Sequence, residues 1–227
     1  MPIKGFVFDF DGLILDTEIP LFEVYRELFA GYGVEITMRQ WWRIIGTGHG
    51  EYDPLEHLVQ VSGDHHTTSD FSQIINERVD QRLKMMVPLP GVVDFIQQAN
   101  RLNIFMAVAS SSSRAWVFRH LDRLGLTSSF QHILTLDDVQ HPKPDPELYL
   151  LAASRLNISP ANLIAFEDSY NGIKAAKAAN LYCIAVPNEM TREMQLDQAD
   201  KIVGSFTELS VSDLLASEAD KSLARNS

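Results

Sequence analysis

Short apolar runs of the kind that form buried strands are unevenly distributed along this 227-residue chain. One such run covers residues 3–8 and others recur from residue 104 onward, whereas residues 18–85 contain only helical patterns. From residue 88 the runs alternate with helical segments, as they do in βαβ units. This distribution predicts an α/β fold with a doubly wound parallel sheet as its core and an α-helical domain inserted after the first strand.

The same patterns predict where the domains and elements begin and end. Residues 1–17 and 88–227 are expected to form the core, and residues 18–87 the inserted helical domain, with Pro88 to Gly91 marking the return to the core. In the core, after the first strand, the predicted strands are 104–109, 131–135, 163–166 and 182–186, and the predicted helices are 92–100, 115–124, 146–156 and 172–179. In the insertion, the predicted helices are 21–29, 54–61 and 71–85.

Composition excludes several classes of partner. A formal net charge of −11 argues against nucleic acid or an anionic membrane surface as the main partner. The single cysteine, Cys183, cannot form an internal disulfide and lies in an apolar run, where a small buried side chain is expected. No run is long enough for a transmembrane helix, and the acidic N-terminal segment does not resemble a signal peptide. We therefore expect a cytoplasmic protein, and a monomer.

The first predicted strand ends in two aspartates, Asp9 and Asp11. Asp is a poor strand residue, and two carboxylates so close to a buried strand should repel each other and raise each other's pKa unless a cation is present. A simple turn, with one Asp capping backbone N–H groups, explains one of them but not both. A hard divalent cation together with an attacking carboxylate explains the pair.

Polar residues also follow three other predicted strands. Ser110 follows the second strand, Lys143 the third, and Glu167 and Asp168 the fourth. Since ligands of an open parallel sheet bind outside the carboxyl ends of its strands, these groups should converge on one edge. A carboxylate can attack phosphorus, a second can transfer protons, and Lys and Ser can hold phosphoryl oxygens.

These motifs resemble those of the haloacid dehalogenase-like superfamily, in the branch with a helical cap inserted after the first motif. The run DFDGLILDT at residues 9–17 matches the family's first motif, DxDGxxxDT. Ser110 stands at the second motif, Lys143 at the third, and residues 167–169 at the fourth. Within the branch, the chain is most similar to β-phosphoglucomutase-like phosphatases, over essentially its whole length. The resemblance implies a Rossmann-like core.

The resemblance also implies a role for each matched residue. Asp9 would be the nucleophile and Asp11 the general acid/base. Asp9, the backbone carbonyl of Asp11, and Asp168 would bind Mg²⁺, with Glu167 assisting directly or through a water. Ser110 and Lys143 would hold the transferred phosphoryl group.

The substrate is predicted to be a small phosphorylated metabolite, such as a sugar phosphate. The candidate substrate contacts are Ser111, His49 and Arg78. A β-phosphoglucomutase-type mutase is the alternative, but Leu21 stands where those mutases have a histidine. Dehalogenation has no use for Asp11 or a metal site. A non-catalytic phosphoacceptor, like a response-regulator receiver, also pairs acidic residues with a lysine, but would be about half this length.

Overall fold

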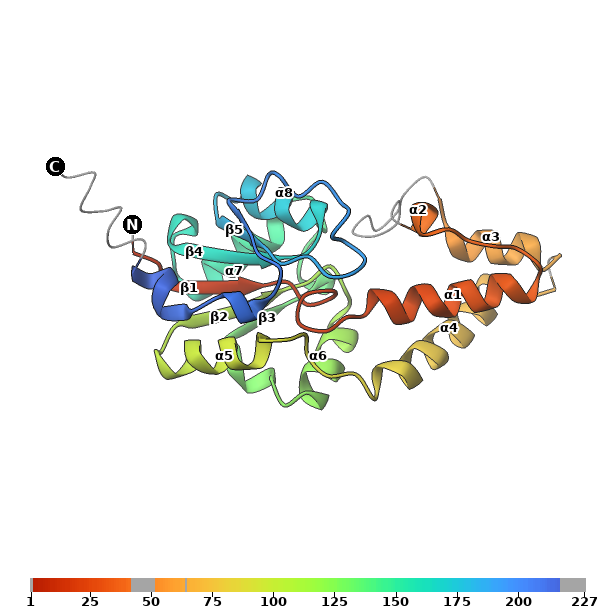
Figure 1. Ribbon diagram of the computed structural model, residues 1–227, viewed down its shortest axis with the longest axis horizontal. Helices are drawn as coiled ribbons and strands as arrows, with labels where there is room; N and C mark the ends of the chain where they lie inside the picture. Colours follow the sequence, from red (N-terminus) through yellow and green to blue (C-terminus); the bar gives the residue numbers. More distant parts are fainter. Residues whose placement is uncertain (1, 42–51, 64, 217–227) are drawn as a thin grey trace.

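The chain is built around a parallel sheet whose central strand is the first in the sequence (Figure 1). The computed structural model describes residues 2–41, 52–63 and 65–216. Among these, six strands pair in the order β3-β2-β1-β4-β5-β6, the arrangement of a doubly wound sheet. Their bounds are β1 Gly5–Phe8, β2 Phe105–Ala109, β3 His132–Leu134, β4 Leu163–Glu167, β5 Tyr182–Ala185 and β6 Lys201–Ile202. The predicted α/β, Rossmann-like class is confirmed.

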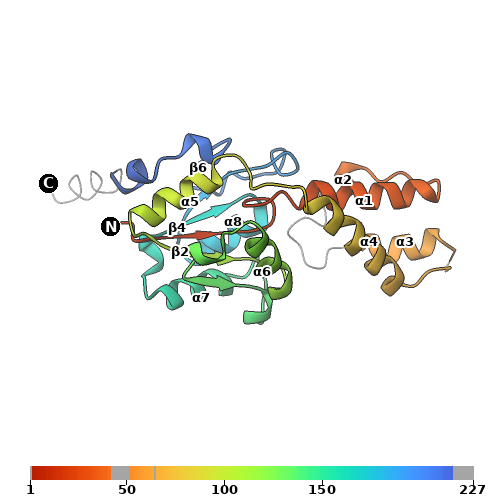
Figure 2. The same ribbon diagram turned by 90° about the horizontal axis from the view of Figure 1, so that it is seen from below.

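Both faces of the sheet are covered, as a parallel sheet requires (Figure 2). On one face, phenylalanine rings from β1 and β4 pack against Phe95 of helix α5 (Val92–Arg101) and against Phe206 near the C-terminus. On the other face, small residues such as Ala107 and Ala165 allow close approach of α7 (Glu147–Leu156) and α8 (Tyr170–Ala178). The alternation of large and small side chains along the strands therefore fixes which helices cover each face.

The observed core elements lie close to the predicted ones. The remaining core helix, α6, spans Arg114–Arg123, and the predicted helices differ from those observed by at most two residues at either end. Strand β6 was not predicted, because its two residues are exposed and carry no apolar pattern. No helix in the described parts of the chain combines the length and apolar character needed to cross a membrane.

The segment between β1 and α5 folds into helices that lie beyond the carboxyl end of β1 (Figures 1 and 2). These helices are α1 Glu18–Gly31, α2 Met38–Trp41, α3 Pro54–Val61 and α4 Thr68–Leu83. Helix α1 packs against both α3 and α4, and the ring of Trp41 is buried against Phe22 and Tyr25. Helix α2, a single turn, was not predicted. The division into two domains remains a prediction.

Hydrogen bonds and an ion pair tie this helical segment to the core. The Leu89 N–H donates to the Ile14 carbonyl at 2.9 Å, which joins the outgoing and returning connections. From helix α6, Arg119 forms an ion pair with Asp80 of α4, with 2.6 Å between Nη1 and Oδ2. Arg123 of the same helix donates to the Met86 carbonyl at 2.8 Å. Helix α6 is therefore the part of the core that contacts both α4 and the returning connection.

Candidate active site

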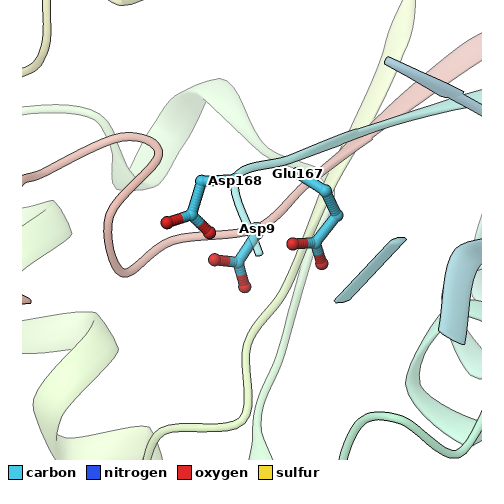
Figure 3. Close-up of side chains that lie close together, drawn as sticks. All are labelled: Asp9, Glu167 and Asp168. Atoms are coloured by element: carbon cyan, nitrogen blue, oxygen red, sulfur yellow. The ribbon is translucent and has the colours of Figure 1, made fainter. Parts of the chain in front are cut away.

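The strand ends bring the predicted site residues to one edge of the sheet. Phe8 at the end of β1 is in register with Val108 of β2 and with Phe166 of β4. Asp9, the next residue after Phe8, therefore lies level with Glu167, and Ser110, two residues after Val108, lies one position further along. Figure 3 shows the carboxylates of Asp9, Glu167 and Asp168 close together at this edge. The structure thus brings together groups that are up to about 160 residues apart, as expected for a parallel sheet.

Asp9, Glu167 and Asp168 form a buried acidic cluster, in which each offers a carboxylate oxygen within 4.8 Å of the others. Burial raises the pKa of Asp9 to about 8; the Lys143 charge opposes this rise, and the charges of Glu167 and Asp11 add to it. Burial, followed by the charges of Asp9 and Glu167, raises the pKa of Asp168 well above its usual range. Three carboxylates are thus held where water solvates them poorly.

Lys143 is the cation within this cluster. Its side chain is buried, and Nζ donates to Asp9 Oδ1 and to Glu167 Oε1, each at 2.6 Å. Burial opposes the charge on Lys143, but the ion pairs with Asp9 and Glu167 outweigh it and hold the pKa of the ammonium above its usual range. The buried hydroxyl of Tyr149, from helix α7, also donates to Glu167 Oε1. Glu167 is therefore oriented by two donors on the same oxygen.

The cluster suits a hard divalent cation. When all three carboxyl groups are ionised, as they would be around a bound cation, the cluster and the one ammonium carry two negative charges in sum; carboxylate oxygens are the ligands that Mg²⁺ prefers. The backbone also makes room for these groups: a Cβ at Gly12, whose φ is +78°, would lie 2.3 Å from Asp168 Oδ2. A Cβ at Gly172 would lie 1.9 Å from Glu167 Oε2. The residues present therefore fit a bound Mg²⁺ held by Asp9 and Asp168.

The side chain of Asp11 is not one of the three clustered carboxylates. It is half-buried and accepts hydrogen bonds from Ser112 Oγ at 2.6 Å and from Ser110 Oγ at 3.3 Å. Ser110 is buried and Ser111 is exposed. Sequence reasoning chose Ser110 and Ser111 from the serine run, and it missed Ser112, which contacts Asp11. Of the three hydroxyls, those of Ser110 and Ser112 thus lie beside the predicted general acid/base.

Asn188 is a second residue that sequence reasoning missed. Its buried Nδ2 donates to Asp168 Oδ2 at 2.8 Å and to the Gly12 carbonyl at 2.9 Å. Asn188 comes shortly after β5, which ends at Ala185. A polar residue that follows a predicted strand was the signal for the other site residues, and the same signal was present for Asn188. Tyr149 carried no such signal, because it reaches the site from the interior of a helix.

Among the described residues, one of the predicted substrate contacts is not joined to this site. Arg78 is exposed on α4, and among the described residues no hydrogen bond or ion pair links it to the strand-end groups. His49 lies outside the described residues. Both therefore remain predictions.

Comparison with known proteins identifies the family to which this chain is similar. The family model described as haloacid dehalogenase-like hydrolase matches residues 6–186. YhcW of Bacillus subtilis (strain 168) is 41% identical over 213 residues, which cover 94% of this chain and 96% of that protein. The phosphorylated carbohydrates phosphatase of Thermotoga maritima is 32% identical over 180 residues, covering 79% of this chain and 82% of that protein.

A solved structure shows the same similarity in three dimensions. The crystal structure of CbbY from Rhodobacter sphaeroides in complex with phosphate matches with a TM-score of 0.70 and 30% identity. The match covers 92% of this chain and 96% of that one. The predicted family and the predicted hydrolase class are both confirmed: the chain belongs to the haloacid dehalogenase-like hydrolases.

Proposed function

We propose that this protein is a Mg²⁺-dependent phosphatase that acts through an aspartyl-phosphate intermediate. Its substrate is a small phosphorylated metabolite, and a sugar phosphate is the favoured class. The observation that carries the proposal is the ion pair of Asp9 with Lys143 beside Glu167 and Asp168. It presents a carboxylate nucleophile next to a fixed cation and a cluster suited to a metal. The substrate class of the Thermotoga maritima relative, given by its name, supports the same assignment.

The reaction needs two phosphoryl transfers. In the first, an Asp9 oxygen bonds to phosphorus as the bond to the ester oxygen breaks, and Asp11 gives that oxygen a proton. In the second, Asp11 takes a proton from a water whose oxygen bonds to phosphorus, and the bond to Asp9 breaks. The products are the alcohol and inorganic phosphate.

The remaining residues bind and neutralise charge. Lys143 and Ser110 would hold the phosphoryl oxygens as they pass from the ester to Asp9. Mg²⁺, held by Asp9, Asp168 and the Asp11 backbone carbonyl with help from Glu167, would supply charge that offsets the phosphate and the acidic cluster. No other cofactor is required.

We further propose that residues 18–87 form a cap domain over a core of residues 1–17 and 88–227. Closing of the cap would exclude water and bring His49 and Arg78 toward a substrate held near Ser111. The small phosphorylated substrate is the only partner that this function needs, with no nucleic acid or membrane. A cytoplasmic location and a monomeric state complete the proposal.

The test is phosphate release from sugar phosphates and other small phosphate esters, with Mg²⁺ or with EDTA. We expect release that EDTA abolishes, and that Asp9→Asn lowers on the order of 10⁴-fold or more, because the nucleophile is lost. Asp94→Asn is the matched control, since Asp94 is an exposed aspartate on α5, and it should leave the rate unchanged.

The alternative activity gives a different product. Conversion of β-glucose 1-phosphate to glucose 6-phosphate, with little free phosphate, would identify a mutase and refute the phosphatase proposal. Absence of both reactions across the panel would refute enzymatic turnover and favour a binding role.

A further inference from the structure

The side chain of Asp11 is surrounded by donors, and they come from separate parts of the chain. Thr17 Oγ1 donates to Oδ1 at 2.9 Å, and the indole Nε1 of Trp116 donates to the same oxygen at 2.8 Å. Ser110 and Ser112 donate to Oδ2. A carboxylate offers about four acceptor positions, so these four donors occupy all of them. Asp11 can reach a substrate only if at least one donor leaves.

The two oxygens are held by groups of different kinds. Oδ2 is held by the hydroxyls of Ser110 and Ser112, which rotate freely and can donate to a phosphoryl oxygen instead. Oδ1 is held in part by an indole N–H, which is a donor with one fixed direction in the plane of its ring. When a phosphoryl group enters beside Ser110, the hydroxyls are free to turn toward it. Oδ2 is therefore the oxygen that becomes available.

The ring of Trp116 is fixed by its neighbours on α6. It packs edge-on against His120, with 4.4 Å between the ring centroids and 69° between the planes. The buried His120 ring stacks in turn on Phe10, and the Arg119 guanidinium lies 5.4 Å from the centroid of the Trp116 ring. An indole held on two sides keeps its N–H aimed at Asp11.

We propose that Trp116 is a positioning residue for the general acid/base. Its N–H, together with the Thr17 hydroxyl, anchors Asp11 Oδ1 so that Oδ2 faces the substrate and exchanges the proton. The proposal rests on the proposed function, because it assigns a role within the same two phosphoryl transfers. Oδ2 gives its proton to the departing ester oxygen in the first and takes one from water in the second. Trp116 keeps its own proton throughout.

The experiment compares two phosphate esters with Trp116→Phe, which removes the N–H and keeps an aromatic ring. An alkyl phosphate, such as the best sugar phosphate of the panel, has a leaving oxygen that needs a proton. p-Nitrophenyl phosphate has a leaving group that departs readily without one. The ratio kcat/KM is the quantity to measure, because it reports phosphorylation of Asp9 and not the hydrolysis step that the two substrates share.

We expect Trp116→Phe to lower kcat/KM for the alkyl phosphate by about ten- to a hundredfold, the loss for one hydrogen bond to a carboxyl group that becomes charged as it gives up its proton. For p-nitrophenyl phosphate we expect a change of less than about threefold, because acid catalysis contributes little there. Thr17→Val, which removes the other donor on Oδ1 and keeps the side-chain shape, should show the same selectivity. Far-ultraviolet circular dichroism of each variant establishes that it is folded.

Ser113→Ala is the matched control for damage to the helix. Ser113 caps α6 through a hydrogen bond from the Trp116 backbone N–H and has no bond to Asp11, so any loss should be equal for the two esters.

Equal loss of both esters in Trp116→Phe and Thr17→Val would overturn the positioning role, as would unchanged kinetics in both variants. Failure of the unmodified protein to hydrolyse either ester would refute the proposed function itself, and this role with it. The two failures are thus distinguishable, because only the second affects the unmodified protein.

Discussion

Lys143 and Asp9 form an ion pair in a place where burial opposes the charge on both side chains. The Lys143 ammonium, 2.6 Å from Asp9 Oδ1, favours the ionised form that the proposed nucleophile needs, but burial outweighs it and the pKa of Asp9 is still raised to about 8. Lys143 also forms an ion pair with Glu167. Asp168 has no such cation among the described residues; it accepts a hydrogen bond from Asn188 instead. A divalent cation would neutralise the negative charge of the cluster that Lys143 does not balance.

The raised carboxyl pKa values predict that Mg²⁺ binding depends on pH. The metal-free folded state holds protons on Asp9 and Asp168 at pH values where a free aspartate has lost them. Binding must displace these protons, so the affinity for Mg²⁺ should increase as pH rises toward about 8, the pKa of Asp9. Calorimetry in buffers of different ionisation enthalpy measures the protons released; an affinity that is constant over pH 5.5–8 would contradict the prediction.

The same groups make the metal-free protein less stable as pH rises. The folded state binds more protons than the unfolded state between the ordinary aspartate pKa and the raised one, so these groups lower the free energy of unfolding as pH increases through that window. Urea denaturation with EDTA and with Mg²⁺ at pH 5.5 and pH 8 should therefore show a larger stabilisation by Mg²⁺ at pH 8. Equal stabilisation at the two pH values would count against these protonation states.

At the scale of elements, the site depends on how closely β4 and α8 approach each other. Gly172 lies in the first turn of α8, directly against the Glu167 carboxylate at the end of β4. Two physical effects of replacing it with alanine oppose each other. Alanine favours a helix over glycine by about 1 kcal/mol, but its Cβ would lie 1.9 Å from Glu167 Oε2. The steric conflict is the larger effect, because Glu167 is held on its other side by Lys143 and Tyr149.

We therefore expect Gly172→Ala to displace Glu167 and to lower the affinity for Mg²⁺ by about tenfold or more, as loss of an oriented group near a metal does. Gly31→Ala is the matched control, because Gly31 ends helix α1 and a Cβ there meets nothing within 4 Å. That variant should keep its metal affinity and should not lose stability. Calorimetric titration with Mg²⁺ and urea denaturation of both variants provide the measurements. Unchanged Mg²⁺ binding in Gly172→Ala would show that the close approach of Gly172 to Glu167 does not affect the metal site.

Elements with a periodic pattern could be predicted from the sequence, and those without one could not. Strands β1, β2 and β4 are continuous apolar runs that end in polar groups, so both the strands and the site residues Asp9, Ser110 and Glu167 carried signals. Strand β6 is formed by two exposed residues whose pairing with β5 depends on the rest of the fold. Trp116 was missed for a similar reason: an aromatic residue inside a helix gives no sign of which carboxylate it will contact.

At the scale of the whole molecule, a cluster of phenylalanine rings packs around the residues that directly precede Asp9 and Glu167. Phe8, directly before Asp9, stacks on Phe166, directly before Glu167, with 5.0 Å between ring centroids. Phe206, near the end of the described chain, packs on both of these rings and on Phe95. Phe206 therefore completes the cluster of rings around the first strand.

Removing that last ring should cost stability and spare the chemistry. We expect Phe206→Ala to lower the free energy of unfolding by about 3–5 kcal/mol, because it deletes a buried ring from a packed cluster. Phe105→Ala is the control: Phe105, at the start of β2, is 49% exposed and should cost far less. Urea denaturation measures both, and kcat of the folded Phe206→Ala protein should stay near the unmodified value. A comparable loss of stability in the two variants would contradict this account of the core.

The hydrogen bond from Leu89 to Ile14 has a consequence for how such a protein can diversify. The helical segment leaves the sheet and returns to it at the same point, so its ends are already fixed side by side by the core. A segment attached in this way can change in length or sequence, or be exchanged for another, while the strands and their order stay as they are. Selection for a new substrate can therefore act on the insertion, and the residues proposed to carry out phosphoryl transfer at the sheet edge can stay the same.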